Sequence, residues 1–110
     1  MLYIPERGDI VWVDFNLQQG KEQTKRRPAI ILSAKLYNKA SGLCILCPIS
    51  SKQKGYPFEV NIEEKKVEGV ILSDQIKSFD WQQRKATFIC KAPKKIMNEC
   101  LEKIKVLIGF

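Results

Sequence analysis

The chain has 110 residues, of which 45% are hydrophobic and 28% charged, and this composition is typical of one globular domain with a single modest core. Nineteen Lys and Arg against twelve Asp and Glu give a formal net charge of +7, which favours an anionic partner such as nucleic acid, although a solubilising surface would carry the same charge. The longest apolar runs are too short to span a bilayer, and the first residues lack the apolar stretch of a secretory signal. We therefore expect a cytoplasmic protein, one domain over residues 1–110, without membrane contact.

The first half of the chain is predicted to form three strands separated by polar segments. Residues 9–15 mix β-branched and aromatic types with polar ones and form the first strand. A polar loop over 16–27 follows, and a second, buried strand over 28–33 begins at a proline, where a missing N–H costs least. A short polar segment over 34–42, long enough for a helical turn, leads to a third strand over 43–49 that is buried on both faces.

Shorter strands and one helix are predicted in the second half. Clean alternation indicates a half-exposed strand over 58–62, and further strands are expected at 69–72, after a charged turn over 63–68, and at 87–90. The helix begins at Pro93, and its apolar residues recur at the spacing that core packing requires: Ile96, Met97, Cys100, Leu101, Ile104 and Leu107. We expect a mainly β (α+β) fold, a compact and mostly antiparallel barrel or sheet with one C-terminal helix.

The four cysteines, Cys44, Cys47, Cys90 and Cys100, are predicted to be buried, reduced thiols. Cys44 and Cys47 lie in an apolar strand, where an offset of three points the two sulfurs to opposite faces, whereas a zinc knuckle needs a turn between them. The chain has no histidine and no second Cys-x-x-Cys pair. We therefore expect no bound metal and no cofactor.

Three large aromatic residues, Trp12, Phe15 and Trp81, are predicted to lie in the core. The alternative is that one of these rings is exposed and stacks on a nucleic-acid base. Asp14, in the first strand, is interpreted as a structural hydrogen-bonding residue and not as an acid.

Two basic loops, 16–27 and 50–57, are predicted to meet at one edge of the sheet. If the strands over 28–33 and 43–49 pair antiparallel, Arg27 at the start of one lies beside Ser50 at the end of the other. That edge would gather cations with hydroxyls and a carboxylate: Lys21, Lys25, Arg26, Arg27, Lys52, Lys54, Ser50, Ser51 and Glu22. Such a groove suits a phosphodiester backbone.

The chemistry open to this edge is narrow. The lack of histidine excludes an imidazole acid–base pair, and no cluster of carboxylates resembles a two-metal nuclease. RNA supplies its own nucleophile, the 2′-hydroxyl, so an enzyme has only to move protons and stabilise a doubly charged phosphorane, and an arginine fork can bond two phosphate oxygens at once. DNA lacks that hydroxyl. The residues therefore favour RNA as substrate and a metal-independent reaction.

Four segments, in the same order, resemble the MazF/PemK toxins of bacterial toxin–antitoxin systems: GDIVWVDF at 8–15, GKEQTKRRPA at 20–29, KGYPFEV at 54–60 and DQIKS at 74–78. The likeness covers nearly the whole chain and ends in KVLIG at 105–109. It implies an SH3-like barrel of the CcdB/PemK type that works as a homodimer. It also implies cleavage of single-stranded RNA at a short sequence, leaving a 2′,3′-cyclic phosphate and a 5′-hydroxyl, and inhibition by an acidic, MazE-like antitoxin whose extended tail covers the RNA groove.

The resemblance further implies roles for individual residues. Arg27 matches the catalytic arginine and Glu22 the loop glutamate, while Ser50 occupies a hydroxyl position at which members usually carry threonine. We expect Arg27 to stabilise the phosphate and transfer a proton, Ser50 to bond the phosphate, and Glu22 to orient groups or assist as a base. The RNA-contacting residues are predicted to be Gln23, Lys25, Arg26, Ser51, Lys52, Lys54, Gln75 and Lys77.

Each catalytic assignment has a structural alternative. Arg27 would also serve as a solvated charge at a strand end, Glu22 as a surface partner of Lys25 or Arg26, and Ser50 as a turn residue bonded to its own backbone. For the whole chain, two other functions compete with the nuclease. One is a CcdB-like gyrase-binding poison that acts through C-terminal apolar contacts, and the other is a catalytically silent RNA-binding module.

Overall fold

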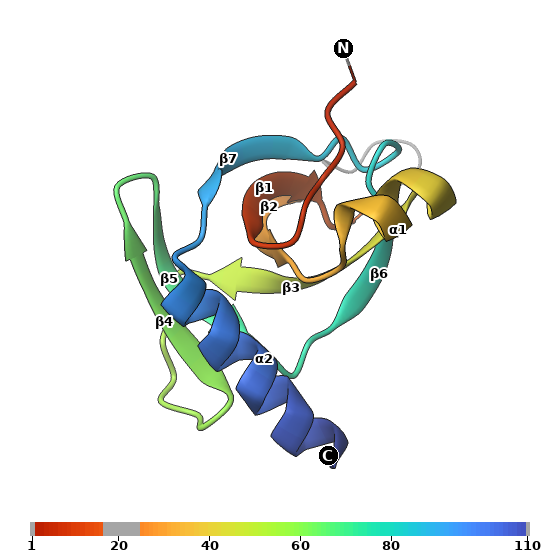
Figure 1. Cartoon of the computed structure of the whole chain (residues 1–110). Helices are drawn as coiled ribbons and strands as arrows, with labels where there is room; N and C mark the ends of the chain where they lie inside the picture. Colours follow the sequence, from red (N-terminus) through yellow and green to blue (C-terminus); the bar gives the residue numbers. More distant parts are fainter. Residues whose placement is uncertain (1, 17–24, 110) are drawn as a thin grey trace.

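The computed structural model describes residues 2–16 and 25–109, which form a strongly curved sheet with a long helix beside it (Figure 1). The strands of this described part are β1 (Asp9–Asp14), β2 (Arg26–Ile31), β3 (Leu43–Ser50), β4 (Glu59–Glu64), β5 (Val67–Leu72), β6 (Lys77–Asp80) and β7 (Thr87–Lys91). The helices are α1 (Lys35–Ser41) and α2 (Lys94–Ile108). The predicted fold class is confirmed: a mainly β chain of antiparallel strands that ends in a helix.

The strand order is β4-β5-β3-β2-β1-β7, with β6 pairing β3 outside this path. β3 has partners on both edges and is the centre of the fold. On one edge, residues 46–48 pair with β2, and on the other, residues 43–46 pair with β6 and residues 49–50 with β5. Because one strand bridges three neighbours, the sheet bends around β3 and brings the β4–β5 hairpin toward β1 and β2.

Two hydrophobic clusters lie on opposite faces of the central strands. The first contains Ile10, Ile30, Cys47 and Ile49 and is covered by Met97, Cys100 and Ile104 of α2, as the helical spacing predicts. The second contains Val11, Val13, Ala29, Ile31, Cys44 and Leu46 and is covered by Phe79 and Trp81. β1, β2 and β3 are therefore buried on both faces over most of their length, which fixes their register.

Cys44 and Cys47 belong to different clusters, so the prediction that their sulfurs point to opposite faces is confirmed. Burial, with a smaller contribution from the Asp80 charge, raises the pKa of Cys44 to about 12, so this thiol stays protonated at neutral pH. The prediction of four buried thiols is wrong for Cys90, which lies half-buried in the short edge strand β7.

Three details differ from the prediction. β2 begins at Arg26, two residues before Pro28, because Arg26 and Arg27 pair with Asp14 and Val13 of β1. Pro28 is tolerated inside the strand because the β2–β3 ladder starts only at Ala29. The turn between β4 and β5 is shorter than 63–68, since the two strands stay paired as far as Glu64 and Val67. The sequence analysis missed β6, a four-residue strand with two exposed polar residues that is formed by pairing with β3.

In the described ranges, no helix has the length and apolar character needed to cross a membrane.

Candidate active site

Pairing of β2 with β3 brings Arg27 and Ser50 to the same end of the sheet, as predicted. Ala29 pairs with Pro48 in the antiparallel ladder. Arg27 lies two residues before Ala29 and Ser50 lies two residues after Pro48, so the two residues are next to each other at the end of the ladder. Arg27 and Ser50 both line a cavity of about 410 Å³ and a neighbouring cavity of about 300 Å³. Both residues are half-buried, so a ligand in these cavities contacts side chains whose backbone is fixed by the sheet.

A third cavity, of about 190 Å³, is also lined by Arg27, and we call the three cavities together the Arg27 groove. All the predicted RNA-contacting residues that the structure describes, except Arg26, line this groove: Lys25, Ser51, Lys52, Lys54, Gln75 and Lys77. Glu22 and Gln23 lie outside the described residues. The topology thus gathers residues from three separate parts of the sequence around one arginine.

The Arg27 groove is strongly cationic. Its described charged side chains are the cations Lys25, Arg27, Lys52, Lys54, Lys66 and Lys77 and the carboxylates Glu59 and Glu68. None of the ion pairs found among the described residues involves these cations. In the same part of the chain, no group of three or more His, Cys, Asp or Glu residues is arranged to hold a metal ion. A polyanion that enters the groove therefore meets guanidinium, ammonium and hydroxyl donors.

Ser50 is held between its own turn and β5. The backbone N–H of Lys52 donates to Ser50 Oγ at 3.1 Å. Ser50 therefore makes the local hydrogen bond that the turn-residue alternative predicts. The Ser50 hydroxyl keeps its own proton to donate to a ligand. Across the ladder, Gly69 adopts a φ of +150°, and a Cβ at this position would lie 2.1 Å from the Ser50 carbonyl oxygen. Only glycine lets β5 pass so close to Ser50. A glycine inside a strand indicates a close backbone contact, but the sequence alone does not say which residue it contacts.

Glu59 orders the basic loop that follows Ser50. Its carboxylate accepts hydrogen bonds from the backbone N–H groups of Lys54, at 3.2 Å, and Gly55, at 3.0 Å. From α2, the Lys103 ammonium donates to the carbonyl oxygens of Pro57 and Glu59. The sequence analysis missed Glu59, because the alternation over 58–62 places this residue on the exposed face of the strand. In the structure Glu59 is buried, and its carboxylate is satisfied by these backbone donors.

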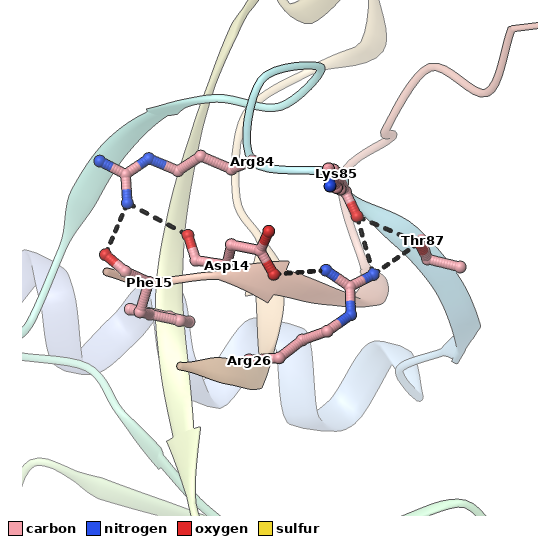
Figure 2. A network of polar contacts seen from close by, with 6 residues as sticks. All are labelled: Asp14, Phe15, Arg26, Arg84, Lys85 and Thr87. Carbon is pink, nitrogen blue, oxygen red and sulfur yellow. Dashed lines mark hydrogen bonds and ion pairs between the residues drawn. The ribbon is translucent and has the colours of Figure 1, made fainter. Parts of the chain in front are cut away.

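Arg26 takes no part in the groove and binds structural partners instead (Figure 2). Its guanidinium pairs with the Asp14 carboxylate at 2.8 Å and donates to the Lys85 carbonyl at 2.8 Å and to the Thr87 hydroxyl at 2.7 Å. Successive residues of a strand point to opposite faces, so this network leaves Arg27 on the other side of β2. The structural role predicted for Asp14 is confirmed.

Arg84 is a second structural arginine, which the sequence analysis missed. Its guanidinium donates to the carbonyl oxygens of Asp14, at 3.1 Å, and Phe15, at 2.6 Å (Figure 2). The guanidinium also lies 3.8 Å from the centre of the Phe79 ring. Between the two arginines, the Phe15 N–H donates to the Lys25 carbonyl at 2.7 Å. Arg26 and Arg84 therefore fix both ends of the segment that connects β1 to β2.

Trp12 contradicts the core prediction. Its side chain is 40% exposed and lines the groove, whereas Trp81 is buried as predicted and Phe15 is half-buried against the second cluster. The difference follows from position: Trp12 lies on the same face as Ile10 but closer to the strand end, beyond the area that α2 covers.

Comparison with known proteins agrees with this geometry. The sequence model of a protein family, described as PemK-like, MazF-like toxins of type II toxin–antitoxin systems, matches residues 6–108 of this chain. The endoribonuclease toxin MazF of Escherichia coli strain K12 is 42% identical over 107 residues, which are 97% of this chain and 96% of that protein. The endoribonuclease toxin ChpB of the same strain is 32% identical over 109 residues, which cover 94% of this chain and 93% of that protein. A crystal structure of MazE–MazF from Deinococcus radiodurans superposes with a TM-score of 0.92 at 42% identity, covering 98% of each chain. The chain therefore belongs to the PemK-like, MazF-like family of type II toxins.

Proposed function

We propose that this chain is an endoribonuclease toxin that cuts single-stranded RNA in the Arg27 groove without a metal ion. The observation that carries this proposal is the convergence of Arg27 and Ser50 on the same cavities, surrounded by lysines. A guanidinium beside a hydroxyl is suited to bind the non-bridging oxygens of a phosphate, and the lysines hold the flanking backbone. RNA cleavage is also the activity named for the MazF and ChpB relatives.

In the proposed reaction the 2′-oxygen of the RNA attacks the adjacent phosphorus and the bond from phosphorus to the 5′-oxygen breaks. The proton of the 2′-hydroxyl goes to a base, for which we propose Glu22, and a proton is delivered to the departing 5′-oxygen, for which we propose Arg27. The products are a 2′,3′-cyclic phosphate and a 5′-hydroxyl. Arg27 and Ser50 contribute most when the phosphorane carries its extra negative charge, which is the condition for lowering the barrier.

An antitoxin is the second expected partner. The related structure from D. radiodurans is a MazE–MazF complex. A groove that collects phosphate charge also attracts an acidic peptide, so we propose that an acidic antitoxin of the MazE kind neutralises this chain by covering the Arg27 groove. We further propose that the toxin is a homodimer and acts in the cytoplasm, where its RNA substrate is found.

The experiment that tests the nuclease uses the purified full chain and a long single-stranded RNA, with and without EDTA. We expect discrete fragments in both conditions, with 5′ ends that accept phosphate from polynucleotide kinase without prior dephosphorylation. Arg27→Ala should leave the RNA intact, and Lys39→Ala, which removes an exposed cation from α1, is the matched control that should cut normally. Intact RNA in every lane contradicts the proposal, and RNA that is bound but uncut would support a silent RNA-binding module.

A further inference from the structure

Trp12 is exposed at a point of the sheet where its neighbours are not. On the same face of β1, Ile10 is fully buried and Asp14 is 8% exposed, while 40% of Trp12 remains accessible. Burial of an indole ring stabilises a fold because it removes a large apolar area from water. The exposure of Trp12 forgoes this stabilisation, so it requires a reason other than the folding of the single chain.

The surroundings of the ring suggest that reason. Trp12 pairs with Pro28 across the β1–β2 ladder and lines the same 410 Å³ cavity as Arg27 and Ser50. On the β4–β5 side, the cavity is bordered by Lys66 and Glu68, both exposed. The cavity therefore combines an anion-binding end, a flat aromatic surface, and a donor and an acceptor at its rim.

We propose that Trp12 forms a nucleobase subsite of the Arg27 groove, in which the indole stacks on a base next to the phosphate held by Arg27 and Ser50. This inference rests on the proposed function and extends it to how the RNA chain is held. Aromatic side chains in cationic grooves bind single-stranded nucleic acid in this way because every base offers a π-face. Glu68 accepts from an exocyclic amine and Lys66 donates to a base carbonyl or ring nitrogen, so the rim is able to distinguish base edges.

The chain supplies its own spectroscopic reference for a test. Its two tryptophans are Trp12 and Trp81. Trp81 is 5% exposed, and its indole N–H donates to the Asn38 carbonyl at 2.9 Å inside the second cluster. A ligand that stacks in the groove therefore changes the emission of Trp12 at longer wavelengths and leaves the shorter-wavelength emission of Trp81 unchanged.

The experiment titrates the full chain with two uncleavable decamers, a mixed-sequence 2′-deoxyribonucleotide pool and an abasic decamer with the same phosphate backbone. Fluorescence anisotropy of labelled decamers records binding, and tryptophan emission records stacking. We expect both decamers to bind and only the base-carrying pool to quench Trp12. Equal quenching by the abasic decamer, or binding without quenching, overturns the proposal. Quenching by an acidic peptide but not by the base-carrying pool also overturns it and assigns the ring to an antitoxin.

Variants give a second, independent readout. Trp12→Phe keeps a ring for stacking and should hold the affinity for the base-carrying pool within a few-fold, while Trp12→Ala should weaken it about 10-fold and leave the affinity for the abasic decamer unchanged. Tyr37→Ala removes a similarly exposed ring, 42% accessible in α1, and should change neither affinity. Equal losses for both decamers in Trp12→Ala would overturn the subsite. RNA cleavage is assayed separately, so a base subsite without nuclease activity is distinguishable from a nuclease without this subsite.

Discussion

The two faces of β2 use neighbouring arginines for opposite purposes. On one face, Arg26 is bound by a carboxylate, a carbonyl and a hydroxyl and ties the end of β2 to the β6–β7 turn and β7. Arg27 points away from this network and lines three cavities with Ser50 and several lysines. One of these cavities is also lined by Trp12, which lies on the same face as Arg26. The comparison shows that basic charge alone does not tell whether a cation is available to a ligand. A cation whose donors are used within the protein holds the structure, and one that faces a groove is available to a ligand.

The largest expected effect separates the two arginines directly. Arg27→Ala should lower kcat for RNA cleavage by about 10²–10³-fold, the usual loss when one donor to a developing oxyanion is removed, and leave the melting temperature unchanged. Arg26→Ala should keep most of the activity and lower the free energy of unfolding by about 1–2 kcal/mol, because Asp14 loses its partner. Single-turnover cleavage and thermal melts measure both. Loss of cleavage in Arg26→Ala at unchanged stability would end the comparison.

Gly69→Ala tests whether the groove face depends on a close backbone contact. The added Cβ would meet the Ser50 carbonyl, so we expect a loss of about 1–3 kcal/mol of stability and a clear loss of cleavage, since Ser50 has to move. Gly42→Ala is the control: Gly42 also has a positive φ, of +74°, but no atom lies within 4 Å of the added Cβ. If the two variants reduce cleavage equally, Gly69 does not position Ser50.

Arg84→Ala should reduce cleavage less than Gly69→Ala and should lower stability by a similar amount. Two charge-assisted hydrogen bonds to the Asp14 and Phe15 carbonyls and the contact with the Phe79 ring are lost, so we expect about 1.5–3 kcal/mol of destabilisation. A several-fold fall in kcat should accompany it, because the segment before Arg27 is no longer fixed at its start. Lys85→Ala, in the same turn, changes a residue that uses only its backbone in the Arg26 network and should alter neither quantity. Full activity and full stability in Arg84→Ala would contradict this role.

The smallest effect is on the salt dependence of RNA binding. Lys52 lines the groove, so Lys52→Ala should reduce the slope of log affinity against log salt concentration by about 0.7, the value for one phosphate contact on a single strand. Arg26→Ala should leave that slope unchanged. Titrations of an uncleavable oligonucleotide at several salt concentrations measure it. A reduced slope in Arg26→Ala would show that this arginine contacts RNA after all.

Much of the fold follows from local pattern. The β-branched and aromatic residues of β1, the alternation in β4, the apolar runs of β2 and β3 and the helical spacing after Pro93 all predict the elements that form. The elements that the sequence analysis missed or misjudged are those held by partners and not by their own residues. β6 has four residues, two of them exposed and polar, and is a strand because β3 offers it a free edge.

The site divides in the same way. The convergence of Arg27 and Ser50 is predictable because neighbouring antiparallel strands place known ends together. Glu59 and Arg84 were not found, since their hydrogen bonds go to backbone groups 4 to 5 and 69 to 70 residues away, respectively. Side-chain type alone does not reveal such partners.

The sequence by itself determined six of the seven strands in the described part of the chain, the terminal helix, the basic character of the two loops and the meeting of Arg27 with Ser50. The tertiary structure alone decided which arginine is bound and which faces the groove, because alternation makes their directions opposite without saying which face is occupied. It also decided that Trp12 is exposed, since burial depends on how far α2 reaches across the sheet. The alternation along a strand fixes the face of the sheet to which each side chain points. The elements that pack against that face decide whether the side chain is exposed and which partners it binds.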